Sequence, residues 1–214
     1  MSSLAIIDYG SGNVRSVRRA IESATAHAGL NVDVQLTDDP ETIARADRIV
    51  LPGVGHYADC AEGLASRTGV IEAMTEAVFG KGRPFLGVCV GMQLMADVGR
   101  EDVETPGLGW IEGAVERLAP ADPKLPIPHM GWNTLVDMKP HPLLASLGSS
   151  PEVYFVHSYA LGAEEPDDVA AACDYGGRFA AAVAKGNMFG TQFHPEKSQQ
   201  AGQLLLAAFL RWSP

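Results

Sequence analysis

The chain has 214 residues, 46% of them hydrophobic, which is enough to bury one core and is short for two full domains. Its formal net charge of -10 disfavours a nucleic-acid ligand, because proteins that bind phosphate backbones usually present a basic face. The sequence has no apolar run of about 18 residues, and its start lacks the basic segment of a secretory signal. We therefore expect a single cytoplasmic domain over residues 1–214, with no membrane contact.

The first quarter of the chain alternates short apolar runs with amphipathic stretches, which predicts a βαβαβ arrangement. The segments in order are residues 4–10, 13–29, 32–37, 40–46 and 48–53. Within the first helix, apolar residues recur at helical spacing while arginines occupy the other face, and Gly29 provides a helix stop.

A longer helical region is expected from Tyr57 to Phe79, followed by a continuous apolar run, residues 85–89, of the kind found in buried parallel strands. Residues 92–98 resume helical spacing. Cys89 is therefore expected at the point where a buried strand gives way to a helix.

Beyond Pro106 the pattern predicts six strand-like segments and a closing helix over residues 199–212. The strand-like segments are residues 110–118, 129–137, 152–161, 169–175, 178–186 and 188–194. The whole order predicts an α/β fold with an open, mainly parallel central sheet, helices on both faces and a smaller antiparallel β region. Ligands of such sheets bind beyond the carboxyl ends of the strands, where Cys89 is expected.

Cys89 has the best sequence context for a nucleophile. The other cysteines, Cys60 and Cys173, are distant and form no C-x-x-C pair, so we expect no structural zinc, no metal and no cofactor. Gly87 and Gly91 flank Cys89 as the glycines of a nucleophile elbow do, since a sharp turn leaves no room for side chains there. A following helix favours the thiolate and offers a free backbone N–H to an oxyanion. The pentapeptide alone leaves a buried, inert cysteine equally open.

A cysteine that attacks an amide needs a proton acceptor, for which histidine is well suited. Of the six histidines, only His194 has a carboxylate two positions later, Glu196, which could orient the ring and stabilise its cation. Read alone, residues 194–196 could equally form a helix-entry turn with an exposed glutamate.

Together, residues 87–93 and 191–196 resemble the class I, triad-type glutamine amidotransferases. The resemblance implies Cys89 as the nucleophile that forms a γ-glutamyl thioester, His194 as its acid and base, and Glu196 as the orienting carboxylate. It implies an oxyanion hole formed by Val54 and Val90, the latter standing where leucine is more usual. The implied glutamine pocket comprises Gly53, Gly55, Gln93, Ser158 and Tyr159.

Further segments are similar to the family of glutaminase subunits of imidazole glycerol phosphate synthase in histidine biosynthesis. They are residues 8–13, 52–56, 129–133, 154–159 and 195–198. That resemblance implies a heterodimer with a (βα)8-barrel cyclase that receives the ammonia and accelerates hydrolysis when it holds its nucleotide substrate. The implied interface residues are Asn13, Trp132, Tyr154 and Lys197.

Alternatives remain open at this point. Trp132 and Tyr154 could be core aromatics, Asn13 a helix N-cap, and Lys197 a solvated charge. The chain could serve another synthase, one making anthranilate or pyridoxal phosphate, or be a catalytically silent regulatory module.

Overall fold

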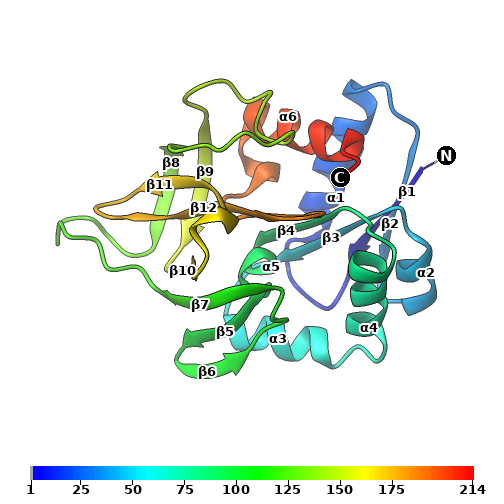
Figure 1. Cartoon of the computed structure of the whole chain (residues 1–214), viewed down its shortest axis with the longest axis horizontal. Helices are drawn as coiled ribbons and strands as arrows, with labels where there is room; N and C mark the ends of the chain where they lie inside the picture. Colours follow the sequence, from blue (N-terminus) through cyan, green and yellow to red (C-terminus); the bar gives the residue numbers. More distant parts are fainter. Residues whose placement is uncertain (1) are drawn as a thin grey trace.

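The computed structural model describes residues 2–214 and is built around one large sheet (Figure 1). Its strands are β1 (Ser2–Ile7), β2 (Val32–Thr37), β3 (Arg48–Gly53), β4 (Phe85–Cys89), β11 (Val169–Asp174), β12 (Arg178–Lys185) and β13 (Met188–Thr191). They lie in the order β11-β12-β13-β4-β3-β1-β2, and all neighbours are parallel except the pairs that β12 makes.

Helices cover both faces of this sheet, with α1 and α6 on one side and α3 and α4 on the other (Figure 1). The helices are α1 (Val14–His27), α2 (Pro40–Arg45), α3 (Tyr57–Ala65), α4 (Val70–Thr75), α5 (Val90–Gln93) and α6 (Gln199–Arg211), and the short turns are η1 (Glu76–Gly80), η2 (Pro166–Asp168) and η3 (Pro195–Lys197). The predicted stop at Gly29 is confirmed, since this residue adopts a φ of 63° just after α1. No helix within residues 2–214 is long and apolar enough to cross a membrane.

Two smaller sheets supply the predicted additional β region. One contains β5 (Ala96–Glu101), β6 (Val103–Pro106), β7 (Ile111–Arg117) and β10 (Tyr159–Ala163), in the order β10-β7-β5-β6. The other is an antiparallel ribbon of β8 (His129–Thr134) and β9 (Glu152–His157). The single strand predicted over residues 152–161 is therefore wrong: the chain changes sheets at Ser158, because β9 pairs with β8 whereas β10 pairs with β7.

The single helical region predicted from Tyr57 to Phe79 is also broken. The segment α3 ends at Ala65, and Gly69, with a φ of 79°, is the residue before α4, so α3, α4 and η1 replace one long helix. Such a left-handed conformation costs little only at glycine.

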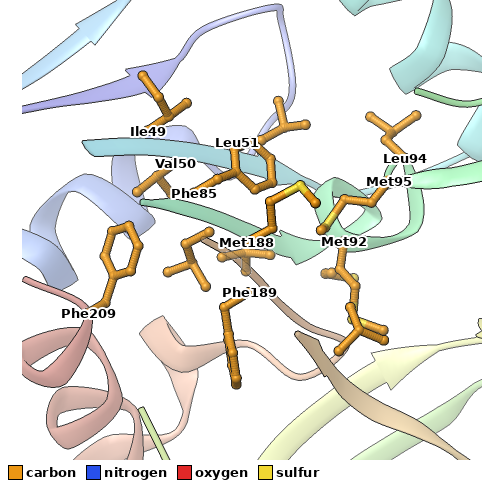
Figure 2. Packing of buried hydrophobic residues seen from close by; sticks show 14 of the residues in the cluster. Ile49, Val50, Leu51, Phe85, Met92, Leu94, Met95, Met188, Phe189 and Phe209 are labelled. Carbon is orange, nitrogen blue, oxygen red and sulfur yellow. The ribbon is translucent and has the colours of Figure 1, made fainter. Parts of the chain in front are cut away.

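The core that carries the site lies around β3, β4 and β13. Ile49, Val50, Leu51, Phe85 and Phe189 are fully buried in it, and Figure 2 shows them with Phe209 of α6. Because the three strands are parallel neighbours, their carboxyl ends lie side by side: Gly53 is in register with Cys89, and Thr191 with Val88. This edge of the sheet is where the predicted catalytic residues meet.

Candidate active site

Cys89 is the last residue of β4 and adopts a φ of 54°, a conformation that is strained for any residue with a side chain. The flanking glycines are required here. A Cβ on Gly91 would lie 1.8 Å from the Leu51 oxygen, and one on Gly87 would lie 2.7 Å from the Gly91 oxygen. The steric argument for a sharp turn at Cys89 is thus confirmed.

The helix predicted over residues 92–98 is wrong, because α5 is only a four-residue turn that ends at Gln93. The carbonyls of Leu94, Met95 and Ala96, which would continue a helix, accept hydrogen bonds from the N–H groups of residues 108, 109, 110 and 111 instead. So short a helix has little dipole to favour a thiolate. The Val90 N–H, as the first of this turn, still has no acceptor within the helix.

His194 follows β13 and forms a buried dyad with Glu196. The His194 Nδ1 to Glu196 Oε1 distance is 2.8 Å, and the two side chains are 0% and 2% exposed. Burial alone would lower the pKa of His194, but the adjoining Cys89 and Glu196 outweigh it and raise the value to about 9. The His194 Nε2 makes no hydrogen bond within residues 2–214, which leaves it free for proton exchange with Cys89.

A cavity of about 530 Å³ opens between these elements. It is lined by ten of the predicted site residues, namely Asn13, Val54, Gly55, Cys89, Val90, Gln93, Ser158, Tyr159, His194 and Lys197. Glu196 is not among its lining residues and contacts the ring of His194. Gly53 is not a lining residue either, and a Cβ there would lie 2.7 Å from the Gly91 nitrogen.

Trp132 and Tyr154 lie outside the cavity, on the β8–β9 ribbon. Their rings meet edge to face at 6.0 Å, and the Lys197 Nζ lies 5.7 Å from the centre of the Tyr154 ring. Trp132 is 46% exposed and Met130 on the same strand 61%, so the alternative of a core tryptophan is wrong.

The strand end at Val54 is held by three side chains. The Val54 N–H donates to Ser11 Oγ at 3.1 Å, the Tyr9 hydroxyl donates to the Pro52 carbonyl at 2.7 Å, and Cys60 donates to the Val54 carbonyl at 3.4 Å. In this conformation the Val54 N–H is occupied, so it can serve an oxyanion only after the bond to Ser11 breaks.

Gln192 belongs to this site although its local sequence did not mark it as a candidate. Its Nε2 lies 3.7 Å from Cys89 Sγ, and its Oε1 accepts a hydrogen bond from Gln93 Nε2 at 3.0 Å. Gln93 Nε2 also donates to the Tyr159 carbonyl at 2.8 Å. The available signal was the position of Gln192, two residues before His194 and directly after β13, the strand that pairs with that of Cys89.

Glu101 was also missed. It lines the cavity from β5, and its Oε2 accepts the Tyr57 N–H at 2.8 Å. It is the only acidic residue among those that line the cavity within residues 2–214. Glu101 was missed because a helix was predicted over residues 92–98, where β5, the strand that carries Glu101, begins.

Two buried histidines form a further unpredicted element, the His129–His157 pair. His129 Nδ1 lies 3.1 Å from His157 Nε2, and His157 Nδ1 lies 2.8 Å from the Tyr159 carbonyl. Since a carbonyl can only accept, His157 carries its proton on Nδ1 and accepts at Nε2 from His129. Burial lowers the pKa of each histidine to about 4, so both are neutral at pH 7. The pair thus fixes the Tyr159 carbonyl that also holds Gln93.

The chain matches a known protein family and several named relatives over almost its whole length. Residues 5–211 match the family described as "Glutamine amidotransferase class-I". The chain is 55% identical to "Imidazole glycerol phosphate synthase subunit HisH" of Rhizobium meliloti, over 99% of both chains. It is 52% identical to the proteins of that name from Mesorhizobium japonicum, over 99% of both chains, and Caulobacter vibrioides, over 100% of both.

Solved structures show the same fold at low sequence identity. A structure described as a glutamine amidotransferase gives a TM-score of 0.69 at 19% identity, over 97% of both chains. A glutamine amidotransferase from Thermotoga maritima superimposes with a TM-score of 0.61 at 15% identity, over 98% of this chain and 83% of that chain.

Proposed function

We propose that this chain, which belongs to the class-I glutamine amidotransferase family and to its group of HisH subunits of imidazole glycerol phosphate synthase, hydrolyses glutamine at Cys89 and passes the ammonia to a partner subunit. The family membership confirms the predicted resemblance, and the predicted α/β fold is confirmed with it. One observation carries the catalytic assignment: Cys89 and His194 line one cavity, and Glu196 is hydrogen-bonded to the far side of the His194 ring.

The chemistry follows from the placement of these groups. Cys89 gives its proton to His194 Nε2, and the sulfur attacks the side-chain carbonyl of glutamine. The C–N bond breaks as His194 returns the proton to the departing nitrogen, leaving a thioester and ammonia. Water, deprotonated by His194, then hydrolyses the thioester to glutamate. Glu196 keeps the proton on Nδ1 and stabilises the imidazolium, consistent with the raised pKa of His194.

The oxyanion of each tetrahedral intermediate is assigned to the N–H groups of Val90 and Val54. The Val90 N–H is the first of α5 and has no acceptor within that helix, whereas the Val54 donor requires release from Ser11. Gly55 has a φ of 99° and no atom within 4 Å of the place where a Cβ would lie, which leaves that peptide room to turn. Glutamine hydrolysis is therefore proposed to be slow until this segment rearranges.

The glutamine pocket is assigned to the cavity walls. A volume of about 530 Å³ suits a small ligand. Gln93, held by the Tyr159 carbonyl, is placed to hydrogen-bond the substrate, as are Ser158 and Tyr159. Glu101 is placed to pair with the α-ammonium group, because it supplies the negative charge of the cavity wall.

The acceptor of the ammonia is assigned from the relatives, which are subunits of imidazole glycerol phosphate synthase. We propose a (βα)8-barrel cyclase as the partner, bound over the exposed Met130, Trp132 and Lys197 and the half-buried Tyr154 beside them, near the cavity that Lys197 lines. Ammonia is mostly protonated at neutral pH, so a shielded path preserves the nucleophile. The three cysteines are all free, which fits a reducing compartment such as the cytoplasm.

Replacing the nucleophile tests this function. The Cys89→Ala chain, assayed with its cyclase partner, should release no glutamate from glutamine yet support product formation from added ammonium salt. Cys173→Ala is the matched control, because Cys173 is buried in β11 and does not line the cavity. Glutamate release by Cys89→Ala would contradict the assignment, and its absence from the wild-type complex would favour a silent regulatory module.

A further inference from the structure

Asn13 does not act as its sequence position suggests. It occupies the residue before α1, where an asparagine side chain usually caps the helix, yet its side chain makes no capping hydrogen bond. Instead its Nδ2 donates to Glu196 Oε1 at 2.7 Å, although the two residues are far apart in the chain. Asn13 is 7% exposed, so this contact lies inside the protein. The N-cap alternative for its side chain is therefore wrong.

The acceptor of this bond is the oxygen that also serves His194. Glu196 Oε1 receives Asn13 Nδ2–H at 2.7 Å and pairs with His194 Nδ1 at 2.8 Å. Glu196 Oε2 is buried and has no hydrogen-bond partner within residues 2–214. A buried carboxylate needs donors to stay ionised, and Asn13 supplies one that is independent of the charge on His194.

We propose that Asn13 is a positioning residue for glutamine hydrolysis, which holds the Glu196 carboxylate ionised and oriented toward His194. This inference rests on the proposed function and extends it. With Glu196 fixed by two donors on Oε1, the His194 proton stays on Nδ1 and Nε2 faces Cys89. Without Asn13, Glu196 can rotate and share its charge between two incompletely satisfied oxygens.

Burial argues that this role is separate from partner binding. The resemblance assigned Asn13 to the interface, but it offers little surface compared with Trp132, which is 46% exposed. Its carboxamide orientation is also set from within, because only the nitrogen side can donate to a carboxylate.

Few charges surround Glu196. Lys197 of the same turn lies over the Tyr154 ring, His157 of β9 is neutral because burial lowers its pKa to about 4, and His194 and Cys89 belong to the triad. The arginines of α1, namely Arg15, Arg18 and Arg19, are exposed, and α6 carries only Arg211 at its far end. Asn13 is the uncharged group that completes this environment.

Two variants test the proposal in the complex with saturating partner subunit. Asn13→Ala should lower kcat for glutamine by about 10- to 100-fold, as expected for one lost hydrogen bond to a charged group, with KM changed less than about twofold. Asn13→Asp places a second carboxylate beside Glu196, so its activity relative to wild type should rise as the pH falls from about 8 to about 6, because a protonated Asp donates.

The matched control is Asn187→Ala, which removes a carboxamide bonded to the Val78 and Arg83 carbonyls away from the cavity. It should lower stability while leaving the pH profile of wild type. Partner affinity, measured separately, should be the same for Asn13→Ala and wild type. In spectra of histidine-labelled protein, the Nδ1 proton resonance of His194 should shift in Asn13→Ala and stay in place in Asn187→Ala.

An unchanged kcat in Asn13→Ala, or a constant activity ratio of Asn13→Asp to wild type across pH, would overturn the proposal. The proposal would also be overturned if Asn13→Ala weakened only the affinity for the partner subunit. The same holds if Asn13→Ala lost stability as Asn187→Ala does, with no separate loss of kcat. If the wild-type complex releases no glutamate, the proposed function fails. The His194 resonance then decides the inference alone, and an identical position in wild type and Asn13→Ala overturns it.

Discussion

Acidification from pH 7 to pH 5 is expected to destabilise the chain through the His129–His157 pair. Burial lowers the pKa of each of these histidines from 6.5 to about 4. Between those values the unfolded chain binds protons that the folded chain excludes, so folding stability falls as the pH falls. The contribution of the two histidines to folding stability is fully present above pH 6.5 and is lost as the pH falls to 4.

The size of the effect follows from the proton difference. At pH 5 a histidine with these two values carries about 0.9 proton more when unfolded, which gives a slope of about 1.2 kcal/mol per pH unit. Both histidines together give about twice that slope. His194 acts in the opposite sense, because its raised pKa of about 9 contributes stability below pH 6.5 that is lost as the pH rises through 9. Near pH 5 His194 is charged in both the folded and the unfolded state and adds almost no slope, whereas above about pH 6 it opposes the effect of the pair.

Urea unfolding followed by tryptophan fluorescence between pH 4.5 and 7.5 measures this slope. His157→Gln removes one of the titrating groups and should reduce the slope near pH 5 by about 1.2 kcal/mol per pH unit. His141, whose pKa burial also lowers, is present in both proteins and cancels. His27→Gln, at an exposed position of α1, is the control. Identical slopes for wild type and His157→Gln would refute the reasoning.

Two further changes probe the elbow and the strand end. Gly91→Ala places a Cβ 1.8 Å from the Leu51 oxygen and should cost about 1–3 kcal/mol of stability, with loss of glutamine turnover. Gly162→Ala is the control and should cost far less, because its Cβ would lie 3.7 Å from the nearest atom. Equal urea-unfolding midpoints for the two variants would contradict this. Ser11→Ala frees the Val54 N–H and should raise glutamine turnover of the isolated chain several-fold, as expected for one hydrogen bond; a steady-state assay showing no rise would contradict it.

The proposed catalytic trio could be inferred from sequence because each member sits in a short local pattern. Cys89 ends an apolar strand between two glycines, and His194 and Glu196 are two positions apart after another strand. Parallel packing then brings the two strand ends together, which is a general property of such sheets.

The rest of the site depends on contacts between distant segments. Residues 92–98 have helical spacing, but the carbonyls of residues 94–96 accept hydrogen bonds from the N–H groups of residues 108–111. The strand β5 therefore forms in place of a helix, and it places Glu101 at the cavity. The His129–His157 pair depends on the register of β8 against β9, in which these two residues are directly opposite. The bond from Asn13 to Glu196 replaces a local cap with a long-range partner, which local propensity cannot indicate.

The position of β13 has a consequence for synthesis of the protein. This late strand is inserted between β4 and β12, near the middle of the large sheet, and the loop after it delivers His194 to Cys89. A nascent chain that has made β1 to β4 already holds its thiol but has neither a base nor a filled sheet. With the roles proposed for Cys89 and His194, glutamine hydrolysis cannot begin on partly made chains. Activity then requires the final long-range strand pairing, which is the slowest kind to form.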